Sequence, residues 1–185
     1  MHIRPHLNVR CVLAVCAWTL LMPLALAAGD DASTPPPRTP TPSCPEGQIH
    51  DRKAGKCVPV QSSTLSDDER YLAVRELAYL AHYAAAALVL DAMSNPDDDR
   101  VLTYRGFIHR KLGQMAQANQ YYQAALEKNP NNLLVRSYMG QGLVASGDLP
   151  AARRQHQEIL ARGGRGTWAE VSLRDALASG QTYRY

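Results

Sequence analysis

The sequence predicts an all-α protein, a short α-solenoid of about three helical hairpins followed by a C-terminal capping helix. Two prolines, Pro96 and Pro130, each follow a helix-forming run, and we call the distance between them the proline interval. When residues 99–132 are written over residues 133–166, which are offset by this same interval, glycines and alanines coincide. Self-similarity at such a period is typical of stacked helical units, because a single pair of helices cannot cover its own apolar face.

Residues 1–27 are expected to be a signal peptide. Arg4 and Arg10 precede the apolar stretch CVLAVCAWTLLMPLALAA, and the small-x-small pattern at residues 25–27 predicts cleavage after Ala27. The alternative is an uncleaved membrane anchor, since the apolar stretch is just long enough to span a bilayer. Both interpretations place the remaining chain outside the cytoplasm, in the periplasm or secreted.

Residues 28–43 predict a disordered Pro/Thr-rich linker, because this segment has few apolar side chains to bury.

Loss of the two leader arginines lowers the formal charge from +3 to +1. No basic block of the nucleic-acid-binding type remains, so nucleic acid is not an expected partner.

Residues 44–60 contain Cys44 and Cys57, the only cysteines beyond the leader. In an oxidising compartment two such thiols are expected to pair, which predicts a small disulfide hairpin. A zinc or thiol site that uses Cys44, Cys57 and His50 is an alternative, although a zinc site would need a fourth ligand. The module is expected to lie outside the core of the repeats.

The helical units follow from residue 65. Residues 65–98 predict a degenerate hairpin whose first helix starts at a capping box, Ser66 to Glu69. Aligned at the proline interval, Ala84 agrees with the later units, whereas Leu72 stands where a small residue is expected and Tyr79 where the turn glycine belongs. Residues 99–132 and 133–166 supply two regular hairpins. Residues 167–185 predict the capping helix and a tail, with a second capping box at Thr167.

The stretch VLTYRGFIHRKLGQMAQANQYYQAALEKNPNN resembles a tetratricopeptide repeat, and the resemblance extends to residues 133–166. The signature residues are the small residues at helix crossings, the turn glycines, the helix B aromatic and the terminal proline: Gly106, Gly113, Ala118, Tyr122, Ala125, Pro130, Gly140, Gly147 and Ala152. Proline cannot continue a helix and biases the preceding residue away from helical geometry, which explains the fixed length of the unit.

The resemblance implies a partner-binding groove lined by the first helix of each unit. Carried over by position, its residues are Thr103, Tyr104, Phe107, Arg110, Lys111, Ser137, Tyr138, Gln141 and Val144, with Glu69, Ala73 and Glu76 from the first unit. The family's clamp for a terminal carboxylate is missing, because Glu69 and Ala73 replace its Lys and Asn. The alternative for Arg110 and Lys111 is that both are solvated cations at a helix end.

No catalytic constellation is recognisable. His109 and His156 occupy positions where the family places packing aromatics, so both are expected to be core or semi-core rings. No nucleophile comes with a matched base, and there is no phosphate-binding loop. We therefore expect a protein that is not an enzyme, has no cofactor or metal, and acts as an adaptor binding a peptide or helix of another envelope protein. A self-associating structural subunit of an envelope complex is an alternative. Membrane contact is expected only through an uncleaved leader.

Overall fold

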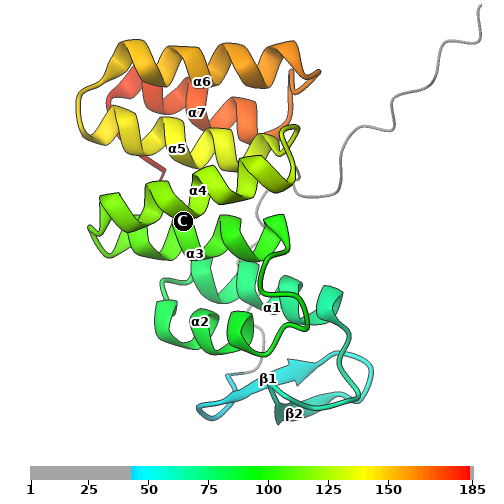
Figure 1. Ribbon diagram of the computed structural model, residues 1–185. Coiled ribbons are helices and arrows are strands. Elements are labelled where there is room, and N and C mark those ends of the chain that lie inside the picture. Colours follow the sequence, from blue (N-terminus) through cyan, green and yellow to red (C-terminus); the bar gives the residue numbers. More distant parts are fainter. Residues whose placement is uncertain (1–42, 184–185) are drawn as a thin grey trace, which may run out of the picture.

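The structure is a computed structural model that describes residues 43–183. The expected signal peptide and nearly all of the expected linker lie outside the described residues. Two strands come first, β1 (Gln48–Asp51) and β2 (Lys56–Pro59). The helices that follow are α1 (Asp67–Tyr79), α2 (Tyr83–Asp91), α3 (Asp99–Lys111), α4 (Met115–Lys128), α5 (Leu133–Ala145), α6 (Leu149–Ala161) and α7 (Trp168–Ser179). The three helical hairpins stack in chain order from the β-hairpin at one end to α5 and α6 at the other, and α7 packs against α5 and α6 (Figure 1). The predicted all-α solenoid is confirmed.

Helix boundaries lie where the sequence places its caps. The Ser66 hydroxyl accepts a hydrogen bond from the Glu69 backbone N–H, and the Glu69 carboxylate accepts one from the Ser66 N–H, so the first predicted capping box is present. The Thr167 hydroxyl caps α7 by accepting from the Glu170 N–H. Asn129, the residue before Pro130, is extended rather than helical, as the proline requires.

The first unit is shorter than the proline interval predicts. The starts of α3 and α5 are separated by that interval (133 − 99 equals 130 − 96), but the starts of α1 and α3 are closer together (99 − 67). The turn between α1 and α2 places Ala81 at φ 62°, where Gly113 has φ 77° in the next unit. Pro96 and Pro130 keep their interval because each lies just before the next helix, at the same distance from its first residue. The two prolines therefore mark the start of the following unit, not the length of their own.

Burial in the first unit supports this shorter register. Ala86, not Ala84, is the fully buried counterpart of Ala118, and Ala84 is exposed. Leu72 is also exposed, because Val74 takes the buried position at the helix crossing. Tyr79 is the last residue of α1 and is buried, so its assignment to the turn-glycine position was wrong.

The central unit is held by a close contact between α3 and α4. A Cβ atom at Gly106 would lie 2.4 Å from the ring of Tyr122, so only glycine allows this approach. Ala118 and Ala125 complete the buried seam of α4. These signature residues of the sequence thus lie at one helix crossing.

In the third unit α7 supplies part of the packing. A Cβ atom at Gly140 would lie 2.5 Å from Leu173 of α7. His156, the counterpart of Tyr122, is only partly buried and lies 3.0 Å from the Glu170 carboxylate. Leu173 and Ala176 are buried in the same cluster as Ala152 and Ile159 of α6. The predicted capping helix therefore completes the core of the last unit.

The two-cysteine module is a stapled antiparallel β-hairpin in which Ile49 pairs with Val58 and His50 with Cys57. The predicted Cys44–Cys57 disulfide is present, with the two Cα atoms 5.7 Å apart. Asp51 is buried at the turn and accepts hydrogen bonds from two backbone N–H groups.

This module packs on the helices, contrary to expectation. Ile49 and Val58 belong to the same buried cluster as Val74 of α1. Arg70 of α1 donates hydrogen bonds from its guanidinium to the backbone carbonyls of Val60, Ser62 and Leu65. The expectation that residues 44–60 lie outside the repeat core was wrong, because the short sheet buries its apolar face on α1.

Candidate protein-binding face

The first helices of the three units place aromatic rings against one another on one face of the stack, which we call the inner face. Tyr104 and Phe107 of α3 lie at its centre. Their ring centroids are 6.2 Å and 4.8 Å from that of Tyr138 on α5. Tyr71 and Tyr79 of α1 add edge contacts to Tyr104 at 5.6 Å and 6.3 Å. Edge-to-face packing of this kind adds stability beyond the buried area.

Three tyrosine hydroxyls form a hydrogen-bonded chain within this cluster. The Tyr104 hydroxyl donates to that of Tyr79 at 3.0 Å, and the Tyr79 and Tyr138 hydroxyls lie 2.9 Å apart. Burial raises the pKa of Tyr104 well above its ordinary value. Because the three hydroxyls belong to α1, α3 and α5, the hydrogen bonds link the first helices of all three units.

Two predicted cations lie beside these rings. The Arg110 guanidinium carbon is 5.5 Å from the Phe107 centroid and 5.8 Å from that of Tyr138. Lys111 Nζ is 5.5 Å from the Phe107 centroid. Arg110 is only 8% exposed, so the alternative of a simply solvated cation is wrong for this residue. Both side chains belong to the aromatic cluster through cation–π contacts.

Three other predicted groove residues make internal hydrogen bonds. Thr103 donates to the Asp99 carbonyl and accepts from Asn132. The Ser137 and Ser172 hydroxyls lie 2.9 Å apart, and Gln141 Nε2 donates to Ser137. Because α7 supplies Ser172, the C-terminal helix lies over this part of α5. The assignment of Ser137 and Gln141 to an open groove was therefore wrong. It was also wrong for the other buried residues of the predicted groove, which are Thr103, Tyr104, Phe107, Tyr138 and Val144. Lys111 alone of the predicted α3 and α5 groove residues is more than marginally exposed.

The first unit contributes different residues from those expected. Glu69, Ala73 and Glu76 face the β-hairpin, where Glu69 pairs with Lys53 at 2.9 Å. The inner face instead receives Tyr71 and Tyr79, together with Arg75, whose guanidinium carbon lies 6.0 Å from the Tyr71 centroid. The sequence does contain the signal for these residues. Aligned by the starts of α1 and α3, Tyr71 and Tyr79 match Thr103 and Lys111.

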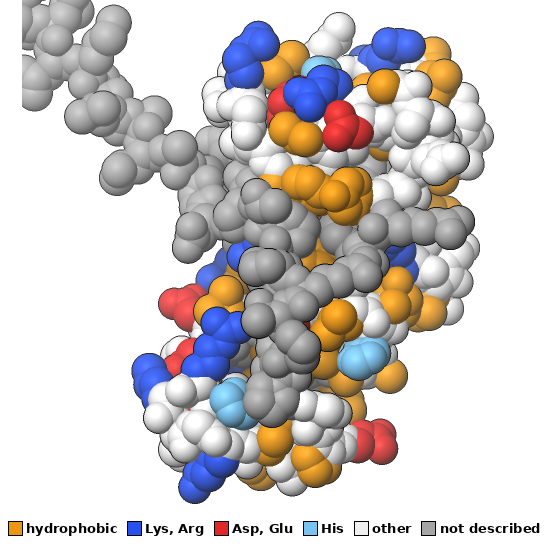
Figure 2. All heavy atoms as spheres, turned by 180° about the vertical axis from the view of Figure 1, so that it is seen from behind, with side chains coloured by type: hydrophobic (Ala, Val, Ile, Leu, Met, Phe, Trp, Pro, Cys, Tyr) orange, Lys and Arg blue, Asp and Glu red, His pale blue; other side chains and the backbone are white. Residues whose placement is uncertain are grey.

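The C-terminal tail reaches the inner face. Lys111 Nζ donates a hydrogen bond of 3.0 Å to the backbone carbonyl of Tyr183. The Tyr183 ring packs edge-on against Trp168, with centroids 4.6 Å apart. Figure 2 shows the side opposite to Figure 1, where hydrophobic side chains are visible in the middle of the molecule and Lys and Arg side chains lie beside them as well as toward both ends.

His82, His109 and His156 do not converge on a site. His109 is partly buried and stacks on Tyr121 with centroids 5.2 Å apart, as expected for a semi-core ring. His156 lies at α7, and His82 is exposed before α2. Within residues 43–183, no group of three or more His, Cys, Asp or Glu side chains has the geometry of a metal site.

The disulfide bears on the zinc and thiol alternative. The sulfur atoms of Cys44 and Cys57 are bonded to each other, so neither is a thiolate ligand or a free thiol. That alternative was therefore wrong for the oxidised protein. Among the described helices, none is long and apolar enough to cross a membrane.

Residues 99–132 match the family model of the tetratricopeptide repeat. No curated protein and no solved structure matches the chain. The matched segment is the hairpin of α3 and α4, the unit that carries the complete signature. The described residues thus form a solenoid of tetratricopeptide-like hairpins, an architecture that generally mediates protein–protein interaction.

Proposed function

We propose that this chain is an exported, non-enzymatic adaptor that binds an extended or helical segment of another envelope protein on its inner face. The contact of the C-terminal tail carries the proposal. Lys111 already donates to a backbone carbonyl of the non-helical tail, whose Tyr183 ring packs on Trp168 of α7. A bound partner segment would use the same two kinds of contact.

The chemistry of the face supports an acidic or amphipathic segment. Lys111, which is partly exposed, and the largely buried Arg110 place positive charge over the buried rings of Phe107 and Tyr138. Within the described residues, Nε and Nη2 of Arg110 are buried without a hydrogen-bond partner. Complementary charge would steer such a partner and fix its orientation.

Export is the second part of the proposal. The leader pattern of residues 1–27 and the Cys44–Cys57 pair both suit an oxidising compartment outside the cytoplasm. Mass spectrometry of the protein isolated from its native cells tests this part. A mature N-terminus at Ala28 and an oxidised cysteine pair are expected, whereas an intact leader in a cytoplasmic fraction contradicts export.

Site-directed cross-linking tests the binding face. A photo-reactive amino acid at Lys111 is compared with one at Arg153, an exposed cation on α6. We expect a discrete protein adduct from position 111 in the native envelope and none from position 153. A Lys111→Glu variant, cross-linked from a second inner-face position, should lose that adduct, while Arg153→Glu keeps it.

Equal adducts from both positions would contradict the proposed face. Arg110 is unsuitable for charge reversal, because a glutamate there would be buried among rings. Adducts made only between copies of this chain would instead support the self-associating subunit.

A further inference from the structure

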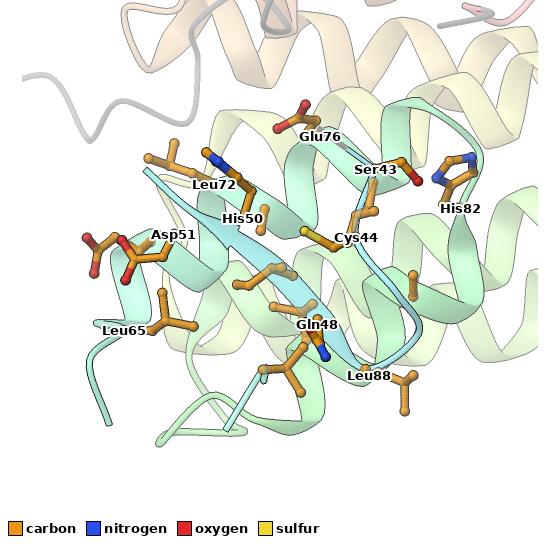
Figure 3. Close-up of a pocket in the computed structure, with 18 of the residues that line it drawn as sticks. Ser43, Cys44, Gln48, His50, Asp51, Leu65, Leu72, Glu76, His82 and Leu88 are labelled. Atoms are coloured by element: carbon orange, nitrogen blue, oxygen red, sulfur yellow. The ribbon is translucent and has the colours of Figure 1, made fainter. Parts of the chain in front are cut away.

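A second candidate site lies away from the inner face, at the N-terminal end of the stack. A cavity of about 440 Å³ lies between the β-hairpin and the helices α1 and α2. Its volume falls within the range of small-molecule pockets, roughly 300 to 1,000 Å³. Figure 3 shows β1 along one side of the cavity, with His50 and Leu72 near one end of the strand.

Leucines from both helices line this cavity and remain exposed. Leu72 and Leu80 are each 43% exposed and Leu88 is 40% exposed. They are three of the six large hydrophobic side chains that are exposed in the described part of the chain. Exposed apolar side chains that gather around one hollow, instead of being scattered singly, mark a binding surface.

The β-hairpin adds a second wall to this helical face and makes it a partly enclosed cavity. Residues 43–53 supply one wall, including Cys44 and Ile49, and α1 with α2 supplies the other. The disulfide joins Cys44 to β2, so it holds the first part of that wall on the hairpin. The two-cysteine module therefore supplies a wall of the cavity that the helices alone would lack.

The charges of the lining favour a cation. Four acidic residues and two basic ones line the cavity, a formal balance of −2 (2 − 4): Glu46, Asp51, Glu69 and Glu76 against Arg52 and Lys53. Asp51 is engaged by the N–H groups of its own turn, and Glu69 by its capping box and a lysine.

Glu76 is the carboxylate best placed to receive a ligand. Its ion pair with Arg52 is long, at 3.7 Å, and the Arg52 side chain is 66% exposed. The Glu76 side chain is only 17% exposed. A long pair whose arginine is exposed to solvent is weak, so a second cation competes for the same carboxylate. In Figure 3 Glu76 lies at the border of the cavity, apart from Leu65 and Leu88.

We propose that this cavity binds a small amphiphile, an alkyl chain with a cationic head group. The chain lies against Leu72, Leu80 and Leu88, and the head group pairs with Glu76. The leucines supply affinity by removing apolar surface from water. Glu76 supplies the preference for charge.

Calorimetry with three matched probes tests the proposal on the full chain. The probes are decyltrimethylammonium, decanol and decyl sulfate, each below its micelle concentration. We expect the cationic probe to bind most tightly and the anionic probe most weakly. Glu76→Gln should bring decyltrimethylammonium to within about threefold of decanol, while Glu127→Gln on the exposed side of α4 changes neither.

The leucines are tested separately from the charge. Leu88→Ser should weaken all probes by about tenfold, whereas Leu112→Ser, at an exposed leucine outside the cavity, should not. If circular dichroism shows that Leu88→Ser unfolds, Ala85→Leu, which fills the cavity, gives the same readout. Absence of binding, a preference for decyl sulfate, or equal effects of the cavity variant and its control would overturn the proposal.

Discussion

Removal of the disulfide should destabilise the helices as well as the hairpin. The bridge joins two cysteines 13 positions apart. In the loop-entropy model such a closure stabilises the folded state by about 3 kcal/mol. Because Ile49, Val58 and Val74 share one buried cluster, the hairpin and α1 are expected to unfold together. The loss should therefore appear in the helical transition.

The variant that tests this carries both Cys44→Ser and Cys57→Ser. Urea unfolding followed by circular dichroism at a helical wavelength gives the free energy of unfolding directly. A loss of about 3 kcal/mol corresponds to a fall in melting temperature of about 6 to 12 °C for a domain of this size. Wild-type protein should show the same fall after reduction, and the double variant should not respond to reductant.

An unchanged helical transition would refute this reasoning. It would mean that residues 44–60 unfold before the helices and that Arg70 holds the module only loosely. A matched measurement on Arg70→Met separates the two cases. This change keeps the bridge but removes the hydrogen bonds to Val60, Ser62 and Leu65, so under the coupled model it also lowers the helical transition.

Three further predictions concern the packing and its pH dependence. Gly106→Ala should cost about 1 to 3 kcal/mol in urea unfolding, because the new methyl meets the rigid Tyr122 ring, while Gly140→Ala should cost less, since the end of Leu173 can move. Deletion of residues 167–185 should cause aggregation visible by light scattering, because it exposes the apolar side chains of α6 that pack with Leu173, and full burial of a side chain such as Leu173 contributes about 2 kcal/mol; an equally stable soluble truncation would contradict it. Bonds from the Ser66 backbone and Lys53 lower the pKa of Glu69 to about 2 from near 4.5. Since the folded pKa is depressed, this stability is present above pH 4.5 and lost as the pH falls toward 2. Thermal melts from pH 6 to 2 should show a shallower fall for Glu69→Gln.

The sequence predicted those features that depend on a local rule. The helix starts at Ser66 and Thr167 follow from capping chemistry, and the stop before Pro130 from the geometry of proline. Gly106 was also predictable, because close helix packing requires a residue without a side chain at a fixed distance from the turn.

The register of the first unit was not predictable from the proline interval. The turn there uses Ala81 in a left-handed conformation, and no glycine marks it. Non-glycine residues adopt this conformation at a cost, so a search for the turn looks for glycine and misses it. The resulting shift in register moved Tyr71, Arg75 and Tyr79 off the expected inner face and placed Glu69 and Glu76 on it. One strained turn therefore changed the predicted charge of one end of the binding face.

The cavity at the β-hairpin forms where a disulfide-linked β-hairpin packs against two helices of the first repeat. No sequence pattern predicted this cavity, because it depends on how two different kinds of segment pack together. Alignment at the proline interval places Leu72 at the helix crossing of the first repeat, where a small residue is expected. In the structure Val74 takes that crossing position instead. Leu72 is exposed and lines a cavity whose opposite wall is a separate, disulfide-stapled module. Leu72, which does not fit the repeat pattern at the proline interval, thus faces the module, whereas Tyr79, which does not fit it either, lies on the inner face. A degenerate repeat beside an added module is therefore the place where exposed misfit residues should first be examined for binding, and the Leu88→Ser and Leu112→Ser pair tests that inference directly.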